Sequence, residues 1–438
     1  MMQTLDLRGR ALSTAELLAL VPRSASDVGS AVDAVDALIA DVRERGSAAL
    51  LDQAERFDRV RPPHVRVPLG ALREAEAALD PAVRAALVEA IDRVRRGTAA
   101  QVPPTVETAI APGARIVQRW QPVDRVGLYV PGGKAVYPSS VVMNVVAAQV
   151  AGVASIALAS PPQAAFGGSV HPTILGAAAL LGVDEVYAMG GAGAIGALAY
   201  GVADLGLEPV QVITGPGNLF VATAKRAVKG VVGIDSEAGP TEILIIADAS
   251  ADPDLIVADL VSQAEHDELA GAVLVTDAPE LAAAVAERLP AAVAGTHHRE
   301  RVETALRGPQ SALVLVDDLE QGARFSNAYA PEHLEVHVSE PDPLVPRLTS
   351  AGAIFVGDST PVSLGDYIAG SNHVLPTGGQ ARFAAGLGAY SFLRPQQIIE
   401  YDRAALRQVA EQVGVLSDAE ALPAHGDAVR ARFRGEQR

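Results

Sequence analysis

The sequence predicts an α/β protein with two doubly wound, incomplete Rossmann-like parallel-sheet domains, a helical N-terminal segment and a small helical C-terminal tail. Three observations lead to this prediction. The chain has 438 residues, 49% of them hydrophobic, which is enough for two or three packed cores. From residue 126 onward, short apolar runs alternate with Ala-rich segments of helical spacing, as in βαβ units. The same alternation restarts near residue 241, so we expect a second unit to follow the first.

The elements follow in a simple order. Residues 24–100 have helical spacing and charged faces and precede every strand-like run, so we predict helices there. In the first unit, helices are expected to begin at Ser139, His171 and Gly193. The strand candidates of both units are SIALAS (155–160), EVYAMGG (185–191), VQVITGPG (210–217), EILIIAD (242–248), AVLVTDA (272–278), SALVLVDD (311–318) and AIFVGD (353–358). The stretch from about residue 385 has a polar, Pro-interrupted helical pattern, which predicts the tail.

Composition excludes several classes of function. The formal net charge is −17 and there is no long basic block, which argues against a nucleic-acid surface. The absence of cysteine excludes disulfides, thiolate metal sites and a covalent thiol mechanism, and it fits a reducing compartment. The N-terminal residues do not resemble a secretory signal, and the apolar window at 141–159 is interrupted by Asn144 and Gln149. We therefore expect a cytoplasmic protein that does not act at a membrane.

Gly-rich turns after two strand candidates are candidate nucleotide sites, because open parallel sheets bind ligands at the carboxyl ends of their strands. Gly191, Gly193 and Gly196 match G-x-G-x-x-G at the opening of a helix, although a plain crossover turn is an equally good interpretation. Backbone amides near Asn218, at another expected helix start, offer a docking point for a phosphate or an amide. Lys134 follows two glycines but lacks the spacing and the hydroxyl of a P-loop, which disfavours ATP binding.

Three polar clusters are candidate metal or substrate sites. Gln263 and His266 are three residues apart on a helical pattern, so their side chains share one face. Two ligands do not make a metal site, and a surface helix with a polar end is the alternative interpretation. The other two clusters are Asp366 with His373, on a Gly- and Ser-rich loop after the last strand, and Glu420 with His425, on either side of Pro423 in the tail.

The stretch YAPEHLEVHV, residues 329–338, places a proline, a glutamate and a histidine together. Pro331 suits the first position of a helical turn, so we expect Glu332 and His333 to lie in that turn. Backbone N–H groups there favour a carboxylate and disfavour an imidazolium, which predicts an ionised acid beside a neutral base. Such a pair suits proton transfer from an alcohol and activation of water. A charged loop end with an incidental histidine is the alternative.

Taken together, several stretches resemble one family. They are RVGLYVPGGKAVYPSSV, GPGN, AGPTEILIIAD, QAEHD, APEHLE, GDYIAGSNHVLPTGG and EALPAHGDAV, and they extend over most of the chain. This combination resembles histidinol dehydrogenase. The resemblance implies a homodimeric enzyme with one zinc ion per subunit that oxidises L-histidinol to L-histidine through L-histidinaldehyde, with two NAD consumed.

The resemblance also implies roles for individual residues. The zinc ligands fall on Gln263, His266, Asp366 and His425, the last supplied by the partner subunit. Glu332 and His333 are the acid/base pair. Substrate contacts fall on Thr241, Gln263, His266, Glu332, His333, Asp366, His373, Glu420 and His425. NAD contacts fall on Tyr129, Asn218 and Gly193, where the family usually has Gln.

The resemblance further implies how the chain is divided. We expect an N-terminal arm at residues 1–25 and an NAD-binding α/β domain at 129–239. A first α/β domain, residues 26–128 with 240–384, would include the helical lead-in and the zinc and catalytic residues. The tail, residues 385–438, would pack on the partner subunit of a homodimer.

Two other functions remain open at this point. The first is a related zinc- and NAD-dependent dehydrogenase of another polar alcohol; Glu420, His425 and His373 argue against it, and Gly193 leaves it open. The second is a zinc hydrolase that uses Glu332 and a metal-bound water, which would leave the two nucleotide-sized α/β units unexplained.

Overall fold

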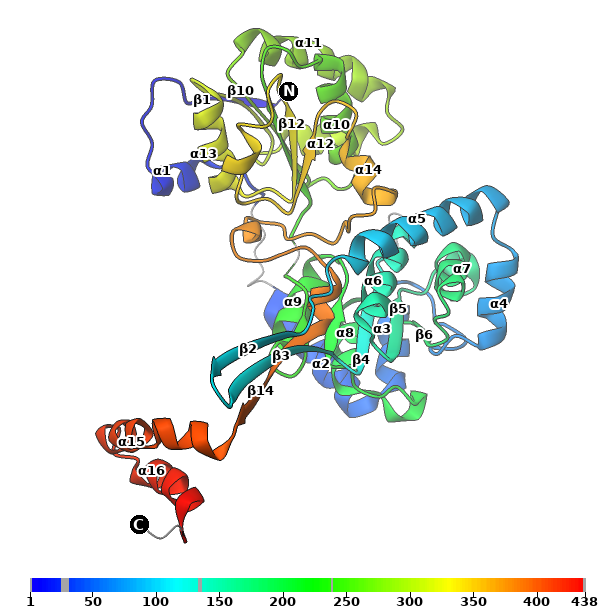
Figure 1. Ribbon diagram of the computed structural model, residues 1–438. Coiled ribbons are helices and arrows are strands. Elements are labelled where there is room, and N and C mark those ends of the chain that lie inside the picture. The colour runs from blue at the N-terminus through cyan, green and yellow to red at the C-terminus, as the bar shows by residue number, and fades with distance from the viewer. Residues whose placement is uncertain (1, 25–30, 133–135, 238, 436–438) are drawn as a thin grey trace. The chain divides into compact units, whose positions relative to one another are not determined.

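The computed structural model describes residues 2–24, 31–132, 136–237 and 239–435 (Figure 1). Lys134, for which ATP binding was disfavoured, lies outside the described residues. The chain forms two compact units, Met1–Gln101 with Val123–Phe392, and Val102–Pro122 with Leu393–Arg438. Among the described helices, none is both long and apolar enough to cross a membrane.

The first unit contains a six-stranded parallel sheet with the strand order β1-β11-β10-β9-β12-β13. Its strands are β1 (Gln3–Asp6), β9 (Glu242–Ala247), β10 (Gly271–Thr276), β11 (Ala312–Leu315), β12 (His333–His337) and β13 (Ala353–Val356). The strand candidates after residue 240 are confirmed. Every residue of β9, β10 and β12 is buried, because helices cover both faces of the sheet. Residues 3–6 are not a separate arm as expected, since β1 pairs with β11 at the edge of this sheet.

Alternate residues along β9 point to two different cores. Ile243 and Ile245 pack in the core beneath one group of helices, whereas Leu244 and Ile246 pack in the core beneath the other. The first group is α10 (Pro253–Ala264), α11 (Pro279–Gly295), α12 (Arg299–Arg307) and the start of α14 (Val362–Tyr367). The second is α1 (Thr14–Leu20) and α13 (Leu319–Tyr329). The sheet is therefore doubly wound, as predicted (Figure 1).

A second parallel sheet in the same unit has the order β6-β5-β4-β7-β8. Its strands are β4 (Arg125–Tyr129), β5 (Ser155–Ser160), β6 (Val186–Ala188), β7 (Val212–Thr214) and β8 (Gly233–Ile234). Its helices are α6 (Pro138–Ala151), α7 (Pro172–Leu180), α8 (Gly191–Tyr200) and α9 (Leu219–Val228), which begin within two residues of the predicted starts where these were given. The strand order changes direction between β4 and β7. The carboxyl ends of these two strands are therefore the expected ligand-binding position of a Rossmann-like sheet.

The helical lead-in packs on the second sheet, which corrects the expected division of the chain. It consists of α2 (Val32–Arg45), α3 (Ser47–Phe57), α4 (Leu69–Ala77) and α5 (Pro81–Ala99). Val35 and Leu50 share a buried cluster with Ile195 of α8, and β4 also belongs to this sheet. The physical reason lies in α8, where residues 192–199 are all buried and apolar or glycine, so a second helical layer must cover its outer face.

Two glycines of the G-x-G-x-x-G pattern serve this helix packing. A Cβ atom at Gly193 would overlap the amide oxygen of Gln53 in α3. At Gly196 a Cβ atom would lie 3.3 Å from the side chain of Ile39 in α2. Gly191 has a φ of +60°, which only glycine adopts readily. The pattern at Gly193 and Gly196 is therefore explained by the close approach of two helices.

The second compact unit combines three strands with two helices. The antiparallel sheet has the order β14-β3-β2, with β2 (Val106–Ala111), β3 (Ala114–Pro122) and β14 (Leu393–Tyr401). The helices α15 (Arg403–Ala419) and α16 (Pro423–Arg430) follow. The tail is helical as predicted, but the prediction missed β14. This strand tolerates Pro395 because it lies at an edge of the sheet and pairs only with β3.

We expect Gly97→Ala to destabilise the chain by about 1–3 kcal/mol, because a methyl group there would overlap the backbone carbonyl of Gly370. This contact fixes the loop between Asp366 and His373 against α5. Gly70→Ala is the matched control, since Gly70 also lies in a helix and has nothing within 4 Å of an added Cβ. The control should be neutral or stabilising by about 0.5–1 kcal/mol. Urea unfolding of both variants tests this, and equal midpoints would contradict it.

Candidate active site

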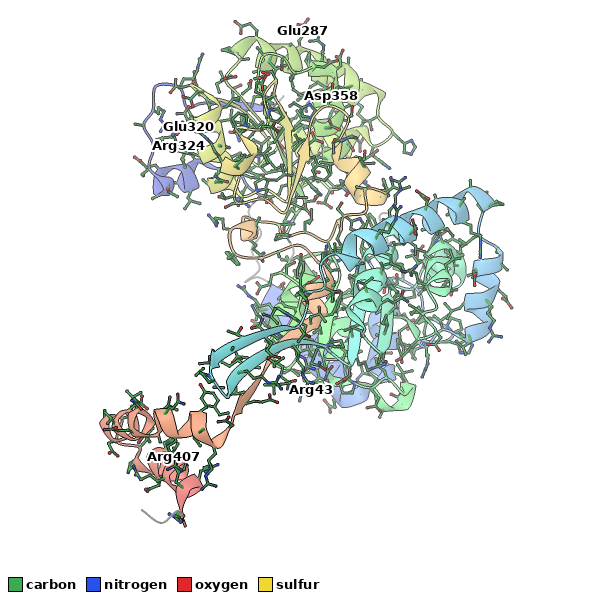
Figure 2. The ribbon with its side chains drawn as sticks, in the orientation of Figure 1. Arg43, Glu287, Glu320, Arg324, Asp358 and Arg407 are labelled. Carbon is green, nitrogen blue, oxygen red and sulfur yellow. The ribbon has the colours of Figure 1, made fainter. Side chains whose placement is uncertain are left out.

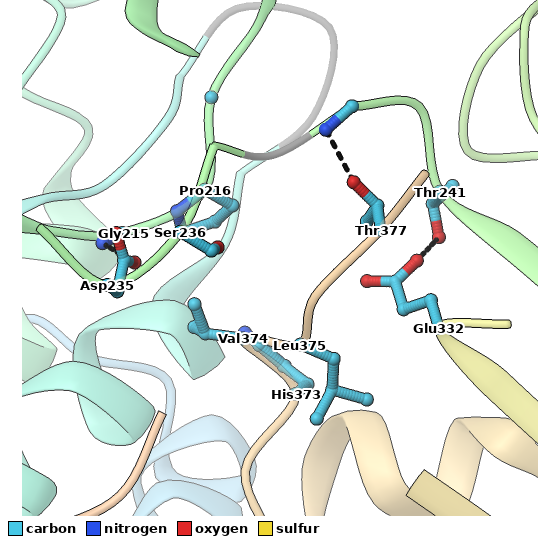
Figure 3. Close-up of a pocket in the computed structure, with 12 residues that line it drawn as sticks. Gly215, Pro216, Asp235, Ser236, Thr241, Glu332, His373, Val374, Leu375 and Thr377 are labelled. Carbon is cyan, nitrogen blue, oxygen red and sulfur yellow. Dashed lines mark hydrogen bonds between the residues drawn. The ribbon is translucent and has the colours of Figure 1, made fainter. Parts of the chain in front are cut away.

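A pocket in the first unit brings together segments that are far apart in sequence (Figure 3). Gly215–Gly217 follow β7 of the second sheet, and Thr241 and Glu332 directly precede β9 and β12 of the first. The rest of the lining comes from the loop after β8, with Asp235, Ser236 and Gly239, and from the segment between His373 and Thr377. The pocket therefore lies at the carboxyl edge of one sheet and at the amino edge of the other.

The conformation around Glu332 differs from the predicted helical turn. Helix α13 ends at Tyr329, Ala330 adopts a left-handed conformation as its C-cap, and Pro331 leads directly into β12. Proline is common just after a helix end because it cannot continue the helix. The prediction of a turn was wrong because the helix precedes Pro331 instead of following it.

Glu332 is buried, and its carboxyl group has two hydrogen-bond donors. The Thr241 hydroxyl donates to Oε2 at 2.5 Å, and the backbone N–H of Glu242 donates to the same atom at 3.1 Å. Burial nevertheless raises the pKa of Glu332 to about 8, against the lowering effect of these two donors. Burial thus works against the ionised acid that the sequence predicted, because it favours the neutral form of the carboxyl group. A carboxyl group with this pKa suits general acid–base chemistry at neutral pH.

His333 is held as a neutral base. Its Nδ1–H donates to the carbonyl oxygen of Glu242 at 3.3 Å, so Nε2 carries the lone pair. The Nε2 atom is buried and has no hydrogen-bond partner. Burial lowers the pKa of His333, which agrees with the predicted neutral imidazole. The geometry leaves one unengaged proton acceptor beside Glu332.

Gln263 lies in α10 and is oriented by the same threonine. Its Nε2 donates to Thr241 Oγ1 at 2.8 Å, while its Oε1 is buried without a hydrogen-bond partner. An unpartnered buried amide oxygen is costly, and a cation that accepts its lone pair would remove that cost. The orientation of Gln263 therefore fits a metal ligand.

The structure brings His266, Asp366 and His373 close to Glu332 and His333. The charge of Asp366 acts on all three of His266, His333 and His373, in each case against a lowering of the pKa by burial. Asp366 lies in the short helix α14, not on the expected loop. His373 Nδ1–H donates to the Asp366 carbonyl at 2.8 Å, and its Nε2 accepts from the Ser140 hydroxyl at 3.0 Å. One ring nitrogen of His373 thus ties the loop to α14, and the other holds it against α6.

Glu420 and His425 belong to the second compact unit. Glu420 is the C-cap of α15, and His425 lies in the first turn of α16. Both side chains are exposed on this unit.

The residues expected to contact NAD lie around the second sheet. Tyr129 ends β4, and its hydroxyl accepts the N–H of Gly191 at 3.2 Å. Asn218 is the N-cap of α9, with its side-chain oxygen accepting from the N–H groups of Phe220 and Val221. Gly193 faces Gln53, as described above.

Sequence reasoning missed two groups of polar residues. The first is a buried ion pair between Lys225 and Asp235, which holds the Gly215 turn: Lys225 Nζ donates to the Gly215 carbonyl at 3.0 Å, and Asp235 accepts the Gly215 N–H at 2.8 Å. The second consists of Asp259, Glu335 and His337. The sequence did contain a signal for two members of this group. Polar residues alternate at positions 333, 335 and 337, which places His333, Glu335 and His337 on one face of a strand.

A Rossmann-type strand order, a second parallel sheet and a pocket between them lined by Glu332, next to the buried imidazole of His333, are typical of an α/β oxidoreductase of the dehydrogenase type. Residues 21–433 match the family model of histidinol dehydrogenase. The chain therefore belongs to the histidinol dehydrogenase family, whose members are NAD-dependent oxidoreductases of histidine biosynthesis.

Individual relatives support this membership over the full length. The chain is 66% identical over 432 residues to histidinol dehydrogenase of Leifsonia xyli subsp. xyli, covering 99% of both chains. It is 58% identical over 433 residues to histidinol dehydrogenase of Thermobifida fusca, covering 99% of this chain and 98% of that one. The crystal structure of histidinol dehydrogenase from Elizabethkingia anophelis has a TM-score of 0.93 at 30% identity, covering 99% of this chain and 98% of that chain.

We expect Thr241→Val to lower kcat/KM by about 10–100-fold, because the hydroxyl orients both Glu332 and Gln263. The buried amide of Gln263 would lose its acceptor, at a cost of about 1–3 kcal/mol in the free energy of unfolding. Thr241→Ser keeps the hydroxyl and is the matched control. Steady-state kinetics and urea unfolding measure both effects, and equal loss in the two variants would show that the methyl group matters instead.

Proposed function

We propose that this chain catalyses the NAD-dependent, four-electron oxidation of L-histidinol to L-histidine through L-histidinaldehyde. Family membership supports the substrate and the reaction class. The observation that carries the chemistry is the buried pair of Glu332 and His333, in which His333 Nε2 is a neutral acceptor without a partner. Such an atom is suited to accept the hydroxyl proton of an alcohol as hydride leaves its carbon.

The two residues have different roles in the two oxidations. In the first, His333 takes the hydroxyl proton while hydride passes to NAD, which leaves the aldehyde. Water then adds to the aldehyde to form a hydrate: Glu332, in its carboxylate form, accepts a proton from that water, and protonated His333 gives its proton to the aldehyde oxygen and becomes neutral again. In the second oxidation, His333 takes a hydrate proton while hydride passes to a second NAD, which leaves the acid. The chain has no cysteine, so a thioester route is closed and the hydrate route is required.

The residues around the pair fit a zinc ion. We propose that Gln263, His266, Asp366 and the partner subunit's His425 hold it. The unpartnered buried Oε1 of Gln263 supports this assignment, as does the proximity of the Asp366 charge to His266. When bound, zinc has no redox role and supplies a fixed point for the amino and imidazole nitrogens of the substrate. Thr241, Glu420 and His373 complete the proposed set of substrate-contacting or positioning residues.

We propose that the chain is a homodimer with a shared active site. Glu420 and His425 are exposed on the second unit, together with Val415, Leu416 and Leu422, whose exposed fractions are 63%, 63% and 45%. Exposed apolar residues with polar residues at their rim are typical of an interface. This surface would place Glu420 and His425 of one subunit in the active site of the other.

The proposed NAD site lies where the strand order of the second sheet reverses. Tyr129 and the Gly215 turn lie at the carboxyl ends of β4 and β7, and Asn218 begins the helix that follows. At Gly193 the chain lacks the side chain that the family usually has, and the Gln53 amide occupies the adjoining space. We propose Tyr129, Asn218 and the backbone at Gly193 as the NAD contacts.

Complete oxidation of L-histidinol should yield two NADH per molecule of substrate. Removal of metal with a chelator should abolish this yield, and added zinc should restore it. The measurement is NADH absorbance at the end point with a limiting amount of L-histidinol. One NADH would indicate an enzyme that stops at the aldehyde, and no NADH would favour a related dehydrogenase of another polar alcohol.

His333→Asn should reduce kcat by about 10²–10⁴-fold, because the general base is lost. His171→Asn is the matched control: His171 caps α7 through its Nδ1, and asparagine is a good N-cap. Mixing His333→Asn chains with His425→Ala chains should recover activity, since each heterodimer contains one intact site. Failure to recover any activity after subunit exchange would contradict the shared site.

A further inference from the structure

A second cluster of metal-ligand side chains lies outside the proposed active site. Asp259 of α10 and Glu335 and His337 of β12 each offer one ligand atom, and these atoms lie within 4.8 Å of one another. Glu335 is fully buried and His337 is 6% exposed. Leu334 and Val336 face the opposite core, so Glu335 and His337 share the face of β12 that α10 covers.

Glu335 is held in place by a backbone hydrogen bond, but one polar atom each of Glu335 and His337 remains to be satisfied. The N–H of Val362 donates to Glu335 Oε1 at 2.9 Å, which leaves Oε2 directed into the cluster. Glu335 Oε2 and His337 Nε2 are 3.4 Å apart and form an ion pair when His337 is protonated; with a neutral imidazole, neither atom has a hydrogen-bond partner. Buried polar atoms of this kind are costly unless a ligand satisfies them.

The two carboxyl groups of the cluster also favour the binding of a cation. In the described part of the chain, no lysine or arginine forms an ion pair with Asp259 or Glu335. Without a metal, two protons would be needed, one on Asp259 and one on His337, each bound to Glu335, whereas one cation can accept a lone pair from all three residues. Two carboxylate oxygens and one imidazole nitrogen form a donor set that suits Zn²⁺ and similar divalent ions.

The position of the cluster in the fold fits a separate site. His337 is the last residue of β12, whereas Glu332 and His333 lie at the other end of this strand. The carboxyl edge of an open parallel sheet is where such sheets usually bind ligands. Asp358 follows β13 at this same edge, is exposed (Figure 2), and its charge acts on His337, so it marks a route for cation entry.

We propose that Asp259, Glu335 and His337 bind a second divalent cation of the zinc class, independent of the proposed catalytic zinc. Ligand atoms around zinc are about 3–4 Å apart, so a small rotation of the half-buried Asp259 side chain completes the site. A cation there ties α10 to β12. Asp259 is one helical turn from Gln263, so the cation also stabilises the helix that presents this proposed active-site residue.

The test is zinc stoichiometry in the full-length enzyme. Chelator-treated protein is reloaded with excess zinc, freed of unbound metal by gel filtration, and analysed for zinc per chain by mass spectrometry. Wild type should retain two zinc ions, and His337→Gln and Asp259→Asn should each retain one. Asp254→Asn, an exposed carboxylate in the first turn of the same helix, is the matched control and should retain two.

His266→Asn separates this proposal from the proposed function. This variant should lose the catalytic zinc and keep the second, and zinc should still raise its melting temperature. The combination His266→Asn with His337→Gln should abolish both. If wild type binds one zinc that is lost in His337→Gln but kept in His266→Asn, the second site stands and the catalytic assignment fails.

The proposal is overturned if His337→Gln and Asp259→Asn retain as much zinc as wild type, which would mean that the cluster holds only protons. Circular dichroism and urea unfolding confirm that each variant folds. If His337→Gln does not fold, the result for Asp259→Asn decides, because its side chain is only half-buried.

Discussion

The hydroxyl group of Thr241 is the interaction on which the arrangement of the active site depends. It donates to Glu332 and accepts from Gln263, so a single oxygen orients the proposed acid and a proposed metal ligand. Thr241 directly precedes β9, which is paired on both sides, with β10 and with β12. A central buried strand is closely packed and rigid, so the side chains at its end are held in fixed positions. This explains why residues far apart in the sequence meet in one fixed arrangement.

Burial then sets the chemistry of these residues. Burial raises the pKa of Glu332 and lowers the pKa of His333, because desolvation disfavours the charged form of each. The pair is thus ready for proton transfer near neutral pH. The same face of β12 continues to Glu335 and His337, which lie with Asp259 in a cluster that has no lysine or arginine partner in the described part of the chain. One strand therefore carries two polar centres, one at each end.

Strands and helices could be predicted from the sequence where local residue pattern decides the structure. Buried parallel strands such as β9 and β10 read as continuous apolar runs, and both were predicted. The prediction was wrong, or missed an element, where a neighbouring segment decides the conformation. Pro331 fits the start of a helix in isolation, but the left-handed cap at Ala330 ends the preceding helix and sends the chain into β12. Strand β14 is mostly exposed, so its polar sequence carried no strand signal until β3 paired with it.

The sequence by itself determined the order of most strands and helices in the two doubly wound units and, through its motifs, the family and the candidate residues at Gln263, His266, Glu332, His333 and Asp366. These follow from periodicity and from residue type, which are local properties. Only the tertiary structure decided that the helical lead-in covers α8, that burial raises the pKa of Glu332, and that Asp259 meets Glu335 and His337. Burial and proximity depend on segments that are distant in the chain, so they arise only when the helices and sheets pack together.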